Sequence, residues 1–88
     1  MSTPESPIRF RGRWREELEA VSPEGTLIFE FTMGKEHVYF PDEARWAALA
    51  PEWAKGKWAF YLESCERWCK EQRYPISVVP DAHFYEEK

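Results

Sequence analysis

Alternating polar and apolar residues mark the beginning of the chain. From residue 8 onward, apolar residues or glycine alternate with four arginines, Arg9, Arg11, Arg13 and Arg15. Successive side chains of a β-strand point to opposite faces, so a strand here would carry all four guanidinium groups on one face. The segment 8–21 also fits two turns of helix through Trp14, Leu18 and Val21. We favour a strand, because residues 22–25 then form a tight link to the next segment.

Residues 26–40 have the pattern of a β-hairpin. Leu27, Phe29 and Phe31 share one face of the first strand, and residues 34–35 turn the chain into a second apolar run at 37–40. Acidic residues of the neighbouring strands are placed to face the arginines, namely Glu17, Glu19 and Glu30. Such cross-strand pairs contribute only ~0.2–1 kcal/mol each.

Helical periodicity follows Pro41. Asp42 is suited to cap a short helix through Ala50, and Pro51 is suited to open a longer one. The longer helix has one apolar face, formed by Ala54, Trp58, Tyr61, Leu62, Cys65, Trp68 and Cys69. Pro75 stops this helix, and residues 76–79 form a last short strand.

These elements predict an α+β fold in a single domain. We expect a small antiparallel β-sheet of three or four strands, packed by one long and one short α-helix. The domain spans 8–80, between a disordered N-terminal tail at 1–7 and a C-terminal tail at 81–88. A length of 88 residues is too short for two cores. A composition with 43% hydrophobic and 17% aromatic residues separates the chain from disordered sequences.

Charge is unevenly distributed along the chain. The residues before position 16 carry four bases and one acid, whereas the remainder carries eight bases and fifteen acids. The whole chain is acidic, with a net charge of −4, whereas nucleic-acid domains are usually basic. No apolar run approaches the ~20 residues that span a bilayer, and we find no signal peptide. We therefore expect a cytoplasmic protein without a membrane partner.

The arginine row is the first candidate binding surface. Four guanidinium groups on one strand face suit a phosphate, a nucleic acid or an acidic protein surface. The alternative interpretation is a solvated face whose arginines pair with glutamates of the next strand. Base stacking has little support, because Phe10 and Trp14 lie on the opposite face of the strand.

A second candidate surface lies on the predicted long helix, outside its apolar face. Trp53 and Phe60 are seven residues apart and nearly coincide on the helical wheel, with Lys57 beside them. Exposed aromatic residues next to a cation have the composition of an interface core. In the alternative interpretation the preceding helix, which carries Trp46, folds back over them, because large rings are usually buried.

Metal binding and catalysis have the least support. Cys65 and Cys69 lie in the apolar face of one helix, where we expect reduced thiols. Zinc sites usually show a second matching pair of ligands, and the remaining candidates are scattered: His37, Asp81 and His83. The sequence contains no Gly-rich phosphate loop and no nucleophile elbow. We therefore expect no metal, no cofactor and no enzymatic activity.

The function that these patterns favour is non-catalytic protein binding. Compact acidic domains of this size serve as adaptors, inhibitors or immunity-type proteins, although a fold class alone does not fix a function. The partner is then another protein or a second copy of the chain, which an uncovered edge strand would allow. The alternative is an anion or nucleic-acid binder that uses the arginine row.

Overall fold

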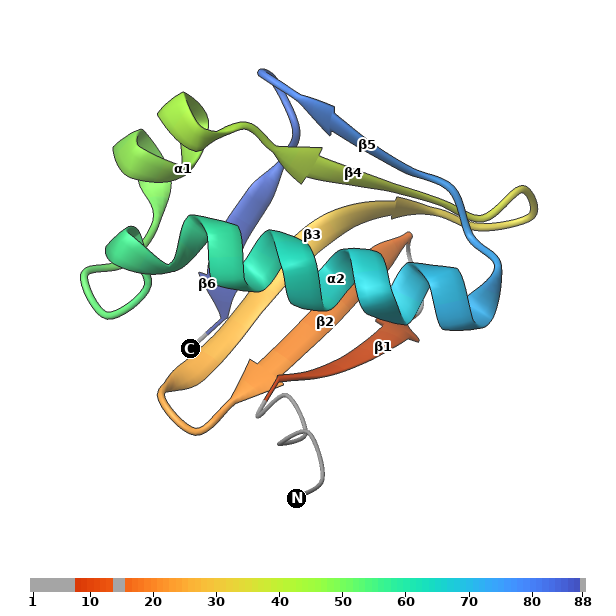
Figure 1. Ribbon diagram of the computed structural model, residues 1–88, viewed down its shortest axis with the longest axis horizontal. Coiled ribbons are helices and arrows are strands. Elements are labelled where there is room, and N and C mark those ends of the chain that lie inside the picture. Colours follow the sequence, from red (N-terminus) through yellow and green to blue (C-terminus); the bar gives the residue numbers. More distant parts are fainter. Residues whose placement is uncertain (1–7, 14–15, 88) are drawn as a thin grey trace.

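A six-stranded mixed β-sheet with one long helix across its face forms the body of the molecule (Figure 1). The computed structural model describes residues 8–13 and 16–87. The strands are β1 (Arg9–Arg13), β2 (Glu17–Ser22), β3 (Gly25–Thr32), β4 (His37–Pro41), β5 (Ile76–Val79) and β6 (Phe84–Glu87). The helices are α1 (Glu43–Leu49) and α2 (Trp58–Gln72), and a 3-10 turn, Lys55–Lys57, leads into α2.

Strand β3 organises the sheet. One of its edges pairs with β2 along the full length of that strand, and the other edge is shared by two strands. The first half of β3 pairs with β6, and the second half pairs with β4. Strand β4 in turn pairs with β5 in parallel, so the remaining order is β1-β2-β3-β4-β5. The sheet therefore forks at β3, with β6 in one branch and β4–β5 in the other (Figure 1).

The predicted single α+β domain is confirmed, whereas the predicted sheet is wrong in size and direction. We expected three or four antiparallel strands, and the structure has six strands with one parallel pair. Residues 9–13 and 17–21 are extended as favoured, but they belong to two strands, β1 and β2. Residues 84–87, expected in a C-terminal tail, form β6. The predicted tail at 1–7, together with Trp14 and Arg15, lies outside the described residues.

The two helices begin and end for local reasons. The Asp42 side chain accepts the N–H of Arg45 at 2.9 Å and caps α1, as predicted. The longer helix begins at Trp58 and not at Pro51, because the Pro51 carbonyl closes a turn with the N–H of Ala54 at 2.9 Å. Helix α2 ends at Gln72, because the next residue, Arg73, has a left-handed φ of 63° and caps the helix.

The core lies between the sheet and the two helices. A nearly parallel stack of rings occupies its centre, formed by Phe29, Phe40, Trp46 and Phe84, with neighbouring centroids 4.9–6.1 Å apart. The Trp46 indole N–H donates to the carbonyl of Ala54 at 2.8 Å, so the ring is buried with its polar atom satisfied. The predicted apolar face of α2 packs on this core. No helix in the described part of the chain is long and apolar enough to cross a membrane.

Candidate functional site

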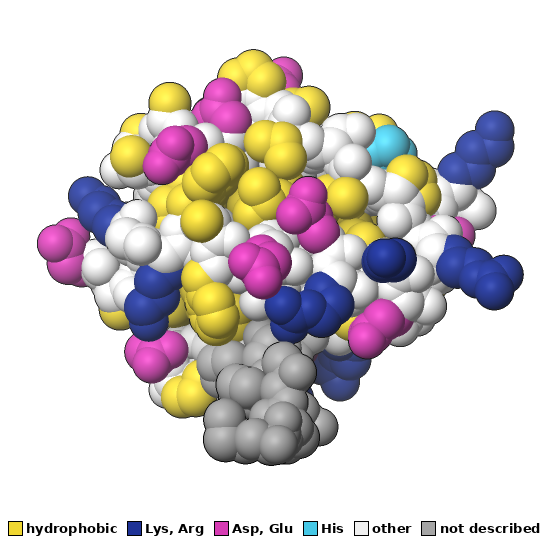
Figure 2. Space-filling view, in the orientation of Figure 1, with side chains coloured by type: hydrophobic (Ala, Val, Ile, Leu, Met, Phe, Trp, Pro, Cys, Tyr) yellow, Lys and Arg dark blue, Asp and Glu magenta, His cyan; other side chains and the backbone are white. Residues whose placement is uncertain are grey.

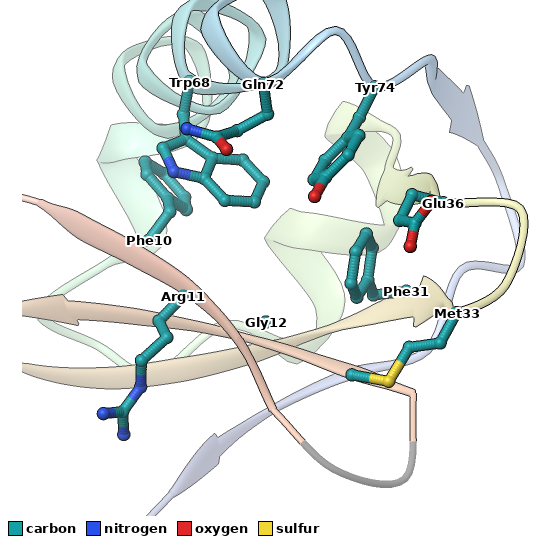
Figure 3. Close-up of a pocket in the computed structure, with 9 residues that line it drawn as sticks. All are labelled: Phe10, Arg11, Gly12, Phe31, Met33, Glu36, Trp68, Gln72 and Tyr74. Atoms are coloured by element: carbon teal, nitrogen blue, oxygen red, sulfur yellow. The ribbon is translucent and has the colours of Figure 1, made fainter.

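A cavity of about 490 Å³ opens between β1 and the C-terminal end of α2 (Figure 3). Its walls are four aromatic rings, from Phe10, Phe31, Trp68 and Tyr74. The centroids of successive rings are 5.9 Å apart for Phe10 and Trp68, 5.6 Å for Trp68 and Tyr74, and 5.8 Å for Tyr74 and Phe31. The rings therefore form one continuous wall, which we call the aromatic wall.

Each ring reaches the cavity through the local structure of its element. The alternation of β1 turns Phe10 towards α2, and the helical spacing of α2 places Trp68 opposite it. The left-handed residue Arg73 reverses the chain after α2, so that the N–H of Tyr74 donates to the carbonyl of Cys69 at 2.8 Å. The C-terminal cap of α2 thus positions the Tyr74 ring in the aromatic wall.

Gly12 leaves space on the β1 side of the cavity. A Cβ atom at this position would lie 2.9 Å from Cε2 of Phe31, which is closer than side-chain atoms normally approach. Phe31 is itself buried, so its ring has little freedom to move away. The alternation of residues 8–15 placed Phe10 and Gly12 on one face, but it carried no signal that Phe31 and Tyr74 would approach them.

The charged residues that line the cavity differ in whether they are paired. The Arg11 side chain points away from the cavity in Figure 3, and its guanidinium pairs with Glu19 at 3.1 Å. Glu36 and Gln72 also line the cavity. The Glu36 carboxylate has no salt bridge with any residue in 8–13 or 16–87. Among the described residues that line the cavity, Glu36 is thus the one charged group without a salt bridge.

The predicted arginine row lies on the outer face of the sheet, which is the face turned away from α2. Arg9, Arg11 and Arg13 share this outer face, and Arg15 lies outside the described residues. The Arg13 guanidinium bonds to Glu17 at 3.0 Å and to Glu19 at 3.3 Å, as predicted for the neighbouring strand. It also pairs with Glu87 of β6.

The ion pairs of Arg13 belong to a network that spans the outer face. The Tyr85 hydroxyl donates to the Glu17 carboxylate, and this bond is the main reason that the pKa of Glu17 is lowered. The bond to Glu87 likewise raises the pKa of the Arg13 guanidinium. Ile28 lies between Glu19 and Tyr85 in the sheet and is buried under this network. Arg13 therefore holds the outer face together and has few free donors for a ligand.

Glu30 lies on the same outer face as the arginine row, as predicted, because it stands opposite Glu17 in the register, but among the described residues it forms no salt bridge with an arginine. Its carboxylate instead accepts the backbone N–H of His83 at 3.1 Å. This bond ties β3 to the segment that leads into β6. The residue thus supports the attachment of β6, for which the sequence pattern gave no signal.

The second predicted surface does not exist as a single helical face. Trp53 precedes α2, packs against Gly25, and donates its indole N–H to Glu86 at 3.0 Å. Lys57 pairs with Glu24 at 3.6 Å. Phe60 lies on α2 and remains 46% exposed. Figure 2, which looks onto α2, shows apolar side chains interspersed with charges over the helices. A binding role for these three residues stays a prediction.

The residues with catalytic or metal-binding chemistry are dispersed. Cys65 and Cys69 are free and buried, and their mutual hydrogen bond together with burial raises the pKa of the Cys65 thiol. Within the described ranges, no group of three or more His, Cys, Asp and Glu side chains is placed to hold a metal ion. His37 contacts the Ser77 hydroxyl through Nε2 at 2.8 Å, a pair that sequence reasoning missed because it depends on the parallel pairing of β4 and β5.

Comparisons with protein-family models, with curated proteins and with solved structures found no match to this chain. The chemistry of the cavity lining is therefore the best guide to function. Its described lining holds four rings, one thioether, one amide and one unpaired carboxylate, but no cysteine, serine or histidine that would act as a nucleophile. Such a lining presents aromatic rings together with a few polar groups to a bound side chain or small molecule.

Proposed function

We propose that the protein is a small non-catalytic protein-binding domain, of an adaptor, inhibitor or immunity type. It recognises an extended segment of its partner at β1 and the adjoining cavity. The observation that carries this proposal is the aromatic wall, which borders an open cavity directly beside the terminal strand of the sheet. Interfaces concentrate their binding energy in such aromatic pockets.

Strand β1 is suited to receive an extended peptide. Within the described part of the chain its one pairing partner is β2, and both Arg11 and Gly12 are exposed. Peptides commonly add a strand to such an edge through main-chain hydrogen bonds, while pockets select alternate side chains. A peptide residue directly opposite Gly12 would lie on the same face of the sheet as the cavity. One side chain would then reach the aromatic wall.

The size of the cavity supports a side chain or small group as its occupant. A volume of about 490 Å³ falls in the range of roughly 300–1,000 Å³ that ligand pockets show. Phe10, Trp68 and Tyr74 are each partly exposed, so their rings retain surface that a ligand would cover. Burial of that surface by a partner contributes about 25 cal/mol per Å² before the cost of association.

The alternative, an anion or nucleic-acid site on the arginine row, has less support. Arg11 and Arg13 are already paired with Glu17, Glu19 and Glu87. A phosphate would have to displace these carboxylates while approaching an acidic protein. A second copy of the chain remains an alternative occupant of β1, and concentration-dependent dimerisation would identify it.

Selection from a random peptide display library tests the proposal. The full chain is the bait, and selected peptides are then measured against Trp68→Ala and Phe60→Ala. Both substitutions remove a ring from α2, but only the first removes part of the aromatic wall. We expect peptides with a shared pattern to lose about thirtyfold in affinity with Trp68→Ala, as for a hot-spot residue, and to bind Phe60→Ala as they bind the wild type.

Several outcomes would contradict the proposal. A selection that yields no peptide with a reproducible pattern contradicts it, as do selected peptides that bind both variants equally well. Peptides that lose binding only with Arg11→Glu, with a steep dependence on salt, would support the arginine row instead. A folded Trp68→Ala variant, judged by its circular dichroism spectrum, is required for the comparison.

A further inference from the structure

The cavity combines aromatic faces with a single negative charge. Four rings border the space between β1 and α2, and Glu36 is the one carboxylate in the described lining (Figure 3). The face of an aromatic ring carries a negative potential, which attracts a cation placed over it. The arrangement therefore favours a positive group over a neutral or negative one.

The one basic residue of the lining does not cancel this preference. Arg11 is 74% exposed, points away from the rings in Figure 3, and pairs with Glu19 across the sheet. Its charge is thus partly compensated on the outer face. Glu36, in contrast, has no cationic partner among the described residues, so it is available to a ligand.

The cost of removing a cation from water selects among cations. A primary ammonium or a guanidinium that enters the cavity gives up hydrogen bonds to water and needs protein acceptors in exchange. The side chains that offer acceptor oxygens are Glu36, Gln72 and the Tyr74 hydroxyl, set among four rings. A quaternary ammonium has no N–H groups to satisfy, and its methyl groups pack directly on ring faces.

We propose that the aromatic wall binds a quaternary or fully methylated ammonium group, with Glu36 as the counter-charge. This inference rests on the proposed function in so far as both use the same cavity. The group has two possible sources, a methylated lysine side chain of the protein partner or a free choline-like molecule. The cavity recognises the shared chemistry, and the experiment distinguishes the sources.

Choline and its neutral isostere 3,3-dimethylbutan-1-ol are the probes. Each is titrated into the full ¹⁵N-labelled chain, and the indole N–H resonances of the tryptophans report binding. We expect choline to shift the Trp68 indole resonance and to leave that of Trp53 unchanged, because Trp53 lies at Gly25 and not in the cavity lining. The neutral isostere should bind about twofold to thirtyfold more weakly, which corresponds to the usual strength of cation–π contacts.

Two variants and a control locate the site. Trp68→Ala should weaken choline binding at least about fivefold. Glu36→Gln, in the turn between β3 and β4, keeps the shape of the cavity and should weaken choline binding by up to about fivefold without affecting the isostere. Phe60→Ala should bind choline as the wild type does. Glu36→Gln keeps the test valid even if Trp68→Ala does not fold.

A capped peptide with one trimethyl-lysine separates the two sources. Binding that is tighter than that of choline and of the unmodified lysine peptide supports a partner side chain, whereas binding equal to that of choline supports a small molecule. Equal affinity for choline and its neutral isostere overturns the inference, as does the lack of any shift at Trp68. If selected peptides still require Trp68 in that case, the proposed function stands. If choline binds but no peptide is selected, the proposed function fails alone.

Discussion

A methyl group added at Gly25 should force Trp53 out of its place. The backbone of Gly25 is not in the left-handed region, so alanine is compatible with its conformation. Its Cβ, however, would lie 2.7 Å from Cζ2 of Trp53 and 3.1 Å from Cε2. The indole is held in place by its hydrogen bond to Glu86 at 3.0 Å, and a retreat from the added methyl group would strain or break this bond.

The expected cost follows from two opposing terms. Overpacking of a well-packed site costs about 1–3 kcal/mol. Replacing glycine by alanine where the backbone allows it recovers about 0.4–1 kcal/mol through the unfolded state. We therefore expect Gly25→Ala to lower the free energy of unfolding by about 1–2 kcal/mol. Urea denaturation followed by circular dichroism measures this difference.

Gly56→Ala is the matched control, because no atom lies within 4 Å of the Cβ it would add. This variant should be between neutral and about 1 kcal/mol more stable than the wild type. In a Trp53→Phe background, where the smaller ring withdraws from the contact, Gly25→Ala should lose its penalty. The reasoning is refuted if Gly25→Ala is as stable as the wild type, or if its penalty persists without the indole.

Three further predictions concern the core, the outer face and α1. Trp46→Phe should lower the free energy of unfolding by about 1–3 kcal/mol in urea denaturation, because it shrinks the central ring stack and removes the indole hydrogen bond to the Ala54 carbonyl, which keeps the N–H of Lys57 as a donor. A loss below 1 kcal/mol would mean that water or a shifted ring replaces the bond. Tyr85→Phe should be less stable than the wild type at neutral pH, and the difference should shrink in acid. Because the pKa of Glu17 is lower in the folded state than its ordinary value of 4.5, the bond from Tyr85 contributes its full stability at pH values above 4.5. This contribution is lost as the pH falls through the lower pKa of the folded state. Denaturation at a series of pH values checks this, and a difference independent of pH would contradict it. Asp42→Ala should cost about 1 kcal/mol through loss of the α1 cap, whereas Asp42→Asn, measured in the same way, should retain most of the stability.

The sequence predicted those elements whose limits are set by neighbouring residues. The hairpin formed by β3 and β4, the cap at Asp42 and the apolar face of α2 each depend on a local pattern, and each is confirmed. The start of β2 gave no such signal, because Glu16 adopts a positive φ of 60° where glycine or asparagine is usual. Pro51 was misleading, because its carbonyl closes a turn before the helix begins.

Pairings between distant segments were not predictable from the pattern. Nothing in residues 76–79 indicates that β5 runs parallel to β4, since this direction is set by the path through both helices. Residues 81–88 were expected to form a tail, yet Glu86 accepts the Trp53 indole N–H and Glu87 pairs with Arg13. The aromatic wall is another product of distant contacts, because its rings come from β1, β3 and the end of α2.

The attachment of β6 to β3 has a consequence for how the chain reaches this structure. Half of one β3 edge stays unpaired until Thr26 and Phe29 meet residues 87 and 84, after both helices and β5 have been synthesised. Contacts of such large sequence separation slow folding, because a long loop must close before they stabilise anything. Until then the Phe29 ring lacks the Phe84 ring that stacks on it. Until β6 docks, the chain therefore exposes a strand edge and an apolar ring together, a combination that is prone to aggregation.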